Sequence, residues 1–129
     1  MSIYDQQLGK TAANFVALSA VSFVERGAEV FGDLSAVIHG QRRYTWRQTR
    51  DRSARLVAAL AALGVGRGDT VSAMLANTPE MIEVRYAVPA LGAVLNTLNT
   101  RLDAPLLAWQ MNHCEARVLI TDREFAPAD

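Results

Sequence analysis

Cysteine, lysine and excess charge are all scarce in this 129-residue chain. Cys114 is the single cysteine, so no disulfide can form within the chain, which favours a reducing, cytoplasmic setting. Lys10 is the single lysine, which leaves almost no candidate for a Schiff base or a phosphate-gripping lysine. Thirteen basic residues balance thirteen acidic residues, and this balance argues against a nucleic-acid surface or a binder of acidic membranes.

Long apolar runs are missing as well. The longest, residues 56–65, has about half of the roughly 20 residues that a membrane span requires. The first ten residues include Asp5 and lack the apolar core of a secretory signal. The sequence therefore predicts a soluble, cytoplasmic protein with no membrane span and no nucleic-acid partner.

Apolar residues make up 50% of the chain, which is enough to bury the core of one domain. Residues 1–18 show no clear periodicity and are predicted to be irregular. The remaining pattern predicts, in order, a helix at 19–33, a β-hairpin from runs at 35–40 and 42–46, a helix at 45–64, a strand at 70–77, a helix at 78–92, a strand at 93–99, a helix at 103–115 and a strand at 116–122.

The helix at 45–64 has the clearest signals. Thr45 and Gln48 have the spacing of a capping box, in which each side chain satisfies a backbone amide of the other residue. Leu56, Leu60 and Leu63 are predicted to share the buried face. The strand at 70–77 is continuously small or apolar, as expected of a strand covered on both faces.

The order strand, helix, strand, helix, strand after residue 70 is typical of a parallel sheet covered by helices. The predicted fold class is therefore α/β, a partial parallel sheet with covering helices plus an N-terminal β-hairpin.

Motifs for chemistry are few. The run "GVGRG" at 64–68 contains glycines but follows a helix and opens a strand, so a plain turn is favoured over a nucleotide loop. His39 and His113 lie far apart, with no clustered acids or cysteines, which argues against a metal site. Cys114 is interpreted as a packing residue.

The charged side chains also have ordinary interpretations. Arg50, Arg52 and Arg55 are interpreted as a solvated helical face, because Asp51 interrupts them and no aromatic residues lie between them. The carboxylates, including Glu83, are assigned to capping, turns and solubility. No residue is therefore assigned as catalytic, cofactor-binding or metal-binding.

Short motifs follow one another in a fixed order across residues 68–122. They are Gly68-Asp69, Asn77-Thr78-Pro79-Glu80, Gly92-Ala93, Leu98-Asn99, Arg101-Leu102 and the strand Ala116 to Thr121. Taken in this order, they resemble the N-terminal region of the adenylate-forming acyl-CoA synthetases, the AMP-binding ligases. The hairpin "RRYTW" and the segment "SFVERGAEVFGD" are similar to that family too, so the resemblance extends from about residue 14.

The chain departs from the family at Thr97-Leu98-Asn99-Thr100, where the family usually has Pro-Leu-Asn-Pro. We interpret Asn96 to Arg101 as a structural corner whose Asn and Thr side chains bond to nearby backbone. Direct contact with substrate is the alternative, because loops at strand ends carry sites in such sheets.

The resemblance implies a parent enzyme that activates a carboxylic acid, of a fatty-acid-like kind, with ATP and Mg²⁺ and passes the acyl group to CoA. It also implies that the phosphate-gripping loop and the catalytic lysine lie beyond this chain. Residues 1–129 are therefore expected to be the N-terminal portion of an AMP-binding ligase domain, binding no cofactor and inactive alone.

Two kinds of partner follow from this expectation. One is the remainder of the parent ligase, and the other is a second copy that associates through exposed sheet surface. A different class of function stays open: a stand-alone α/β binding or regulatory partner module without catalysis.

Overall fold

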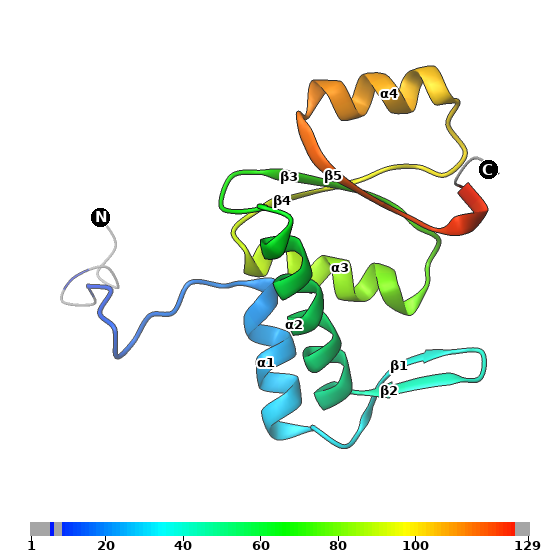
Figure 1. Cartoon of the computed structure of the whole chain (residues 1–129). Coiled ribbons are helices and arrows are strands. Elements are labelled where there is room, and N and C mark those ends of the chain that lie inside the picture. Colours follow the sequence, from blue (N-terminus) through cyan, green and yellow to red (C-terminus); the bar gives the residue numbers. More distant parts are fainter. Residues whose placement is uncertain (1–5, 7–8, 126–129) are drawn as a thin grey trace.

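A computed structural model describes residue 6 and residues 9–125 (Figure 1). Its elements are α1 (Ala20–Val30), β1 (Ser35–His39), β2 (Arg42–Thr45), α2 (Trp46–Ala62), β3 (Thr70–Met74), α3 (Pro79–Ala90), β4 (Val94–Thr97), α4 (Ala104–His113), β5 (Ala116–Thr121) and a short 3-10 helix, η2 (Arg123–Phe125). Residues 9–18 form no helix or strand, which agrees with the predicted irregular segment; residues 1–5 and 7–8 lie outside the described residues.

The predicted α/β fold class is confirmed. β3 lies between β4 and β5 and is parallel to both, with Ser72 opposite Asn96 on one side and opposite Leu119 on the other. β1 and β2 form the predicted antiparallel hairpin, which is a separate sheet.

Helices cover the parallel sheet on both faces. α3 lies against one face, with α1 and α2 beyond it, and α4 lies over the other face (Figure 1). Successive side chains of a strand point to opposite faces, so Val71 and Ala73 of β3 face α3 while Ser72 faces α4. The predicted double coverage of β3 is confirmed, because all three of these residues are fully buried.

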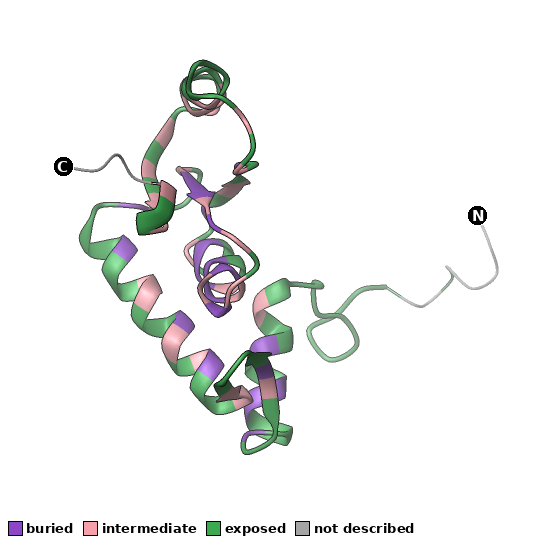
Figure 2. Cartoon of the chain, turned by 90° about the vertical axis from the view of Figure 1, so that its right-hand side faces the viewer, coloured by how far each residue is buried: buried purple, intermediate pink, exposed green. Residues whose placement is uncertain are grey.

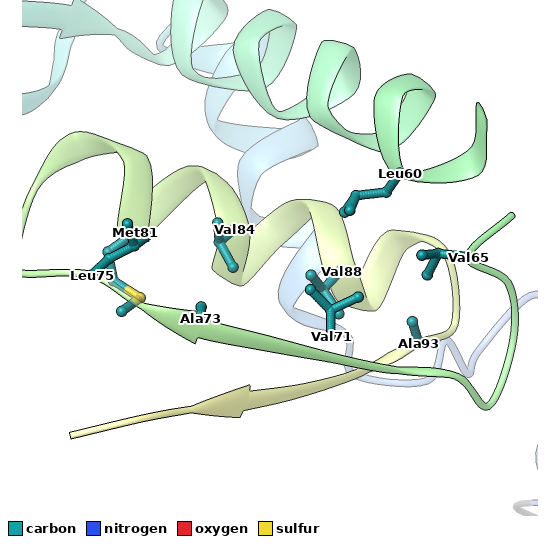
Figure 3. Packing of buried hydrophobic residues seen from close by; sticks show 9 residues of the cluster. All are labelled: Leu60, Val65, Val71, Ala73, Leu75, Met81, Val84, Val88 and Ala93. Atoms are coloured by element: carbon teal, nitrogen blue, oxygen red, sulfur yellow. The ribbon is translucent and has the colours of Figure 1, made fainter. Parts of the chain in front are cut away.

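The main hydrophobic core lies between α2, α3 and the α3 face of the sheet (Figure 3). Its buried members are Leu60, Val65, Val71, Ala73, Leu75, Met81, Val84, Val88 and Ala93. Val118 and Ile120 of β5 pack against this cluster from the edge of the sheet. The core therefore connects α2 to all three strands through α3.

α2 begins as its sequence predicts. The Gln48 amide donates to the Thr45 hydroxyl at 3.2 Å, and the Thr45 amide donates to the Gln48 side chain at 2.9 Å. Leu60 is buried, but the prediction for Leu63 is wrong, because it is 66% exposed. Leu63 is the C-cap residue, where the chain leaves the helix and the periodicity of the buried face no longer applies.

A glycine allows α1 and α2 to pack closely. A Cβ placed on Gly27 would lie 2.5 Å from Cε3 of Trp46, which is closer than carbon atoms approach without displacement. Trp46 is the first residue of α2, so its indole ring is held against α1 at the point where the hairpin joins the helices.

The α4 side of the sheet is less covered than the α3 side (Figure 2). No residue of α4 is fully buried, and Leu106 and Trp109 on this helix are exposed. β5 alternates between half-buried and exposed residues, with Leu119 exposed. Across the described residues, none of the helices combines the length and apolar character needed to cross a membrane.

Candidate functional site

The carboxyl ends of the three parallel strands meet at one edge of the sheet, and this edge is the candidate functional site. β3 leads to α3 on one face, whereas β4 leads to α4 on the other face (Figure 1). The connections therefore diverge between β3 and β4, and ligands of open α/β sheets bind outside the carboxyl ends of strands at such a point. The segments that leave the two strands there are residues 75–78 and 98–103.

A small polar cluster lies between the parallel sheet and the C-terminal end of α4. The Asn96 side-chain amide donates to the Ser72 hydroxyl at 3.1 Å and to the Cys114 sulfur at 3.2 Å. The prediction that Asn96 bonds to nearby backbone is therefore wrong. Its side-chain amide instead connects β4 to β3 and to Cys114, the C-cap residue of α4. Cys114 packs over the sheet as predicted, and the cluster fixes α4 relative to the strands.

The corner after β4 has the predicted local geometry at Asn99. The Asn99 side-chain oxygen accepts from the Arg101 amide at 3.0 Å, and the Leu102 amide donates to the Asn99 carbonyl at 3.2 Å. The Leu98 amide continues the ladder to the Ala73 carbonyl at 2.9 Å. These bonds hold the chain in a turn at the strand end, and the structural-corner interpretation is confirmed for this part of Asn96–Arg101.

A hollow of about 350 Å³ lies at the carboxyl end of β5 and beside the start of α3. Its lining residues are Leu75, Glu80, Ile120, Thr121, Asp122 and Arg123. The hollow contains two carboxylates and one guanidinium, so it can accept and donate hydrogen bonds at the site edge.

One carboxylate of this hollow is already paired. Arg42 of the hairpin donates to Glu80 at 2.7 Å and 3.4 Å, which brings the tip region of β1–β2 to the first turn of α3. Burial acts to raise the pKa of Glu80, but the hydrogen bonds and the charge of Arg42 outweigh it and hold the pKa below its usual range. Glu80 is thus an ionised group that orients the hairpin.

At the opposite end of the strands, the glycine-rich run at 64–68 is the turn predicted from its sequence. It joins α2 to β3, and Gly64 and Gly68 have φ of 82° and 86°, values that glycine adopts without strain. The Gly66 amide donates to the Asp69 carboxylate at 2.7 Å, and Arg117 donates to both its oxygens at 3.0 Å. The Gly66 hydrogen bond, followed by Arg117, lowers the pKa of Asp69.

This lowered pKa predicts an acid-dependent loss of stability. A carboxyl group whose pKa is lower in the folded state stabilises the fold above its unfolded value of 3.8, and loses this contribution as pH falls through the lower folded value. We expect Asp69→Asn to be less stable than the native chain at pH 7, with the difference shrinking below pH 3.8. Urea unfolding at pH 7 and at acidic pH measures the difference. Asp33→Asn is the control, because Asp33 is almost fully exposed in its pair with Arg47, and an equal pH response in both variants would contradict the assignment.

The two histidines lie in different parts of the fold, His39 in the hairpin and His113 at the end of α4. Within residues 9–125, no group of three or more His, Cys, Asp and Glu side chains is arranged to hold a metal ion. His39 lies within 3.3 Å of Arg42, and His113 stacks on Trp109 with ring centroids 5.0 Å apart.

The solvated-face interpretation of the α2 arginines is wrong for Arg52. This side chain forms an ion pair with Glu83 of α3, which is 9% exposed. The assignment of Glu83 to capping or solubility is wrong for the same reason, because it lies inside α3 and faces α2. Sequence spacing alone could not reveal this pair, since its members are 31 residues apart.

Comparison with known proteins identifies the family of this α/β layer. The family model of AMP-binding enzymes matches residues 24–129. The peroxisomal acetate/butyrate–CoA ligase of Arabidopsis thaliana is 46% identical over 118 residues, which are 92% of this chain and 21% of that protein. The chain belongs to the AMP-binding enzyme family, as its sequence motifs predict.

Solved structures of CoA ligases contain the same fold. An anthranilate CoA ligase, solved in complex with anthranoyl-AMP, superposes with a TM-score of 0.82 at 29% identity over 90% of this chain and 23% of its own. A fatty acyl CoA synthetase of Mycobacterium tuberculosis superposes with a TM-score of 0.80, also at 29% identity, over 83% of this chain and 22% of its own. The chain thus spans about a fifth of the length of the relatives that it matches.

Proposed function

We propose that residues 1–129 form the N-terminal portion of the ligase domain of an ATP-dependent carboxylic acid–CoA ligase. The observation that carries this proposal is the family match over residues 24–129, on an α/β layer shared with CoA ligases. Related proteins are named for acetate and butyrate, for anthranilate and for fatty acyl groups. A monocarboxylic acid, fatty-acid-like in the first instance, is therefore the proposed substrate class.

The proposed reaction has two steps. A carboxylate oxygen attacks the α-phosphorus of ATP and displaces pyrophosphate, which gives an acyl-adenylate; Mg²⁺ would neutralise charge on the phosphates. The CoA thiol then loses its proton to a base, and the resulting thiolate attacks the acyl carbon and displaces AMP. Both steps develop negative charge on oxygen, which requires positioned cations and hydrogen-bond donors in the complete ligase.

The proposed share of this chain in the reaction is positional. The Ser72–Asn96–Cys114 cluster fixes α4 over the sheet, and the turn at Asn99 directs the chain away from the carboxyl edge. The Arg42–Glu80 pair ties the hairpin to the start of α3. These contacts form a framework that can hold the reacting groups of a ligase domain. Other open α/β sheets bind their ligands at the same carboxyl edge.

We expect the isolated chain to show no exchange of pyrophosphate into ATP with acetate, butyrate or benzoate, because the groups that grip the triphosphate are proposed to lie outside it. A chimera tests the function directly: residues 24–125 replace the matching segment of the acetate/butyrate–CoA ligase of Arabidopsis thaliana. Formation of acyl-CoA by the chimera would support the proposal. A folded chimera without activity, or exchange catalysed by the isolated chain, would contradict it.

Self-association is a second part of the proposal. Val94 and Leu119 are exposed on the outer strands of the sheet, and Leu106 and Trp109 are exposed on α4. Apolar surface of this kind, beside the open edge of a sheet, favours contact with another chain. Sedimentation velocity across a hundred-fold concentration range should show a dimer or larger species, and Leu119→Lys should shift the distribution towards monomer. A concentration-independent monomer would remove this part of the proposal.

The cytoplasmic location remains a prediction from the single cysteine. The acetate/butyrate–CoA ligase is named as peroxisomal, so the family includes another location. Fluorescence microscopy of the chain expressed in its own cell, with a tag at either end, distinguishes the two.

The alternative function is a binding or regulatory partner module without catalysis. The observation that favours it is an apolar groove between the helices and the hairpin. Stabilisation of the chain by a small ligand, with an inactive chimera, would favour this alternative over the ligase function.

A further inference from the structure

A concavity lined by residues of α1, α2, α3 and the hairpin lies on the side of α3 that faces α1 and α2. Figure 1 shows these elements on the side of α3 away from the parallel sheet. The concavity has a volume of about 390 Å³, within the range of roughly 300–1,000 Å³ of small-molecule sites. Its lining residues are Ala20, Ala36, Val37, Trp46, Thr49, Ile82, Arg85 and Tyr86. We refer to it as the Arg85 groove.

The walls of the Arg85 groove are mostly apolar. Val37, Ile82 and the rings of Trp46 and Tyr86 supply its larger surfaces, and alanines at two positions leave the space between them. Thr49 is buried, and its hydroxyl already donates to the Thr45 carbonyl at 2.9 Å. An apolar ligand body of modest size therefore fits the walls, as it does in most small-molecule sites.

Arg85 is the only ionisable group with a full charge at neutral pH that lines the groove. Arg42, Arg50, Arg52 and Arg117 each form an ion pair, but Arg85 forms neither an ion pair nor a side-chain hydrogen bond with any described residue. A guanidinium remains charged in proteins and presents its donors in a planar fork that matches a carboxylate. Arg85 is exposed, so the groove has a solvent-accessible positive charge beside an apolar surface, and no described side chain neutralises it.

The position of Arg85 places this charge at one end of the apolar space. Arg85 and Ile82 also line a smaller hollow of about 180 Å³, whose other lining residues are Asn77, Thr78 and Met81. Arg85 therefore borders both the apolar groove and a more polar hollow at the start of α3. A ligand with an apolar body in the groove would place its terminal group beside Arg85.

We propose that the Arg85 groove binds a small apolar monocarboxylate, with its carboxylate paired to Arg85 and its hydrocarbon part against Val37, Trp46, Ile82 and Tyr86. One guanidinium compensates one negative charge, whereas a second charge on the ligand would meet only apolar walls and remain unpaired. None of the residues that line the groove belongs to segments 75–78 and 98–103, which leave the strand ends, so this binding site does not depend on the proposed ligase function.

Intrinsic fluorescence provides a direct test, because Trp46 lines the groove and the only other tryptophan, Trp109, is on α4. In a Trp109→Phe background, titration with octanoate should give a saturable change in Trp46 emission. Arg85→Gln should weaken octanoate binding by about fivefold, because an ion pair of an exposed arginine contributes up to about 1 kcal/mol. Arg85→Lys should retain part of the affinity, because it keeps the charge but not the fork.

Two controls separate recognition of the carboxylate from non-specific partition. Octanol has the same chain without the charge, and its binding should be weak and insensitive to Arg85→Gln. Arg67→Gln removes another exposed arginine, from the turn before β3, and should leave octanoate binding unchanged. Ala36→Phe, which fills the groove but keeps Arg85, should abolish the fluorescence change, and unfolding midpoints verify that each variant is folded.

The proposal fails if octanoate gives no saturable change. It also fails if octanol binds as well as octanoate, or if Arg85→Gln and Arg67→Gln have equal effects. Because the titration needs neither ATP nor CoA, its outcome is separate from that of the chimera experiment.

Discussion

Replacing Leu60 by alanine is expected to lower the free energy of unfolding by about 2–5 kcal/mol. Leu60 is 2% exposed and is the residue by which α2 enters the main core, opposite Val88 and Val65 (Figure 3). The substitution removes buried methyl and methylene groups and leaves a cavity, because the packed strands and α3 can close around it only in part. Urea unfolding followed by far-UV circular dichroism measures the change.

Leu63→Ala is the matched control for this experiment. It makes the same chemical change on the same helix, but Leu63 is 66% exposed at the C-cap position. Its removal should alter the free energy of unfolding by less than about 0.5 kcal/mol, as for other exposed positions. If the two variants were destabilised equally, α2 would not be packed through Leu60 as described.

This pair of leucines also shows what the sequence could predict. Helical spacing placed both on one face of the second helix, and it was correct for Leu60 because that residue lies inside regular helix. The same spacing was wrong for Leu63, because the periodicity has no meaning once the chain turns towards Gly64. Local signals with a direct physical effect, such as the Thr45–Gln48 capping box and the alternation of strands and helices, were confirmed.

Contacts between distant residues could not be predicted in this way. Asn96 was expected to bond to nearby backbone, yet its amide bridges Ser72 and Cys114, which are adjacent only once β3, β4 and α4 are assembled. The Arg85 groove has residues from four separate elements and no sequence motif. At the candidate site, the family resemblance predicted where the corner at Asn99 lies. The pairing of Arg42 in the hairpin with Glu80 could be seen only in the three-dimensional structure.

The second large effect is expected at the Arg52–Glu83 pair, another contact of this kind. Arg52→Ala should lower the free energy of unfolding by about 3 kcal/mol, the lower end of the range for breaking a buried ion pair. Glu83 is 9% exposed and would be left without its cation, while the Arg52 side chain is 30% exposed and so is not fully desolvated. The substitution also removes the guanidinium that lies 4.5 Å from the centre of the Tyr44 ring.

Arg50→Ala is the control on the same helix. Arg50 donates to Asp51 at 2.7 Å, but Asp51 is about half exposed, and such a pair contributes only about 0–1 kcal/mol. A double variant, Arg52→Met with Glu83→Leu, distinguishes the cost of a stranded carboxylate from the value of the pair. It should recover most of the stability lost in Arg52→Ala, because apolar side chains of similar size leave no buried charge uncompensated. If the double variant were instead as unstable as Arg52→Ala, the ion pair itself, with its contact to Tyr44, would be what holds α2 and the hairpin against α3.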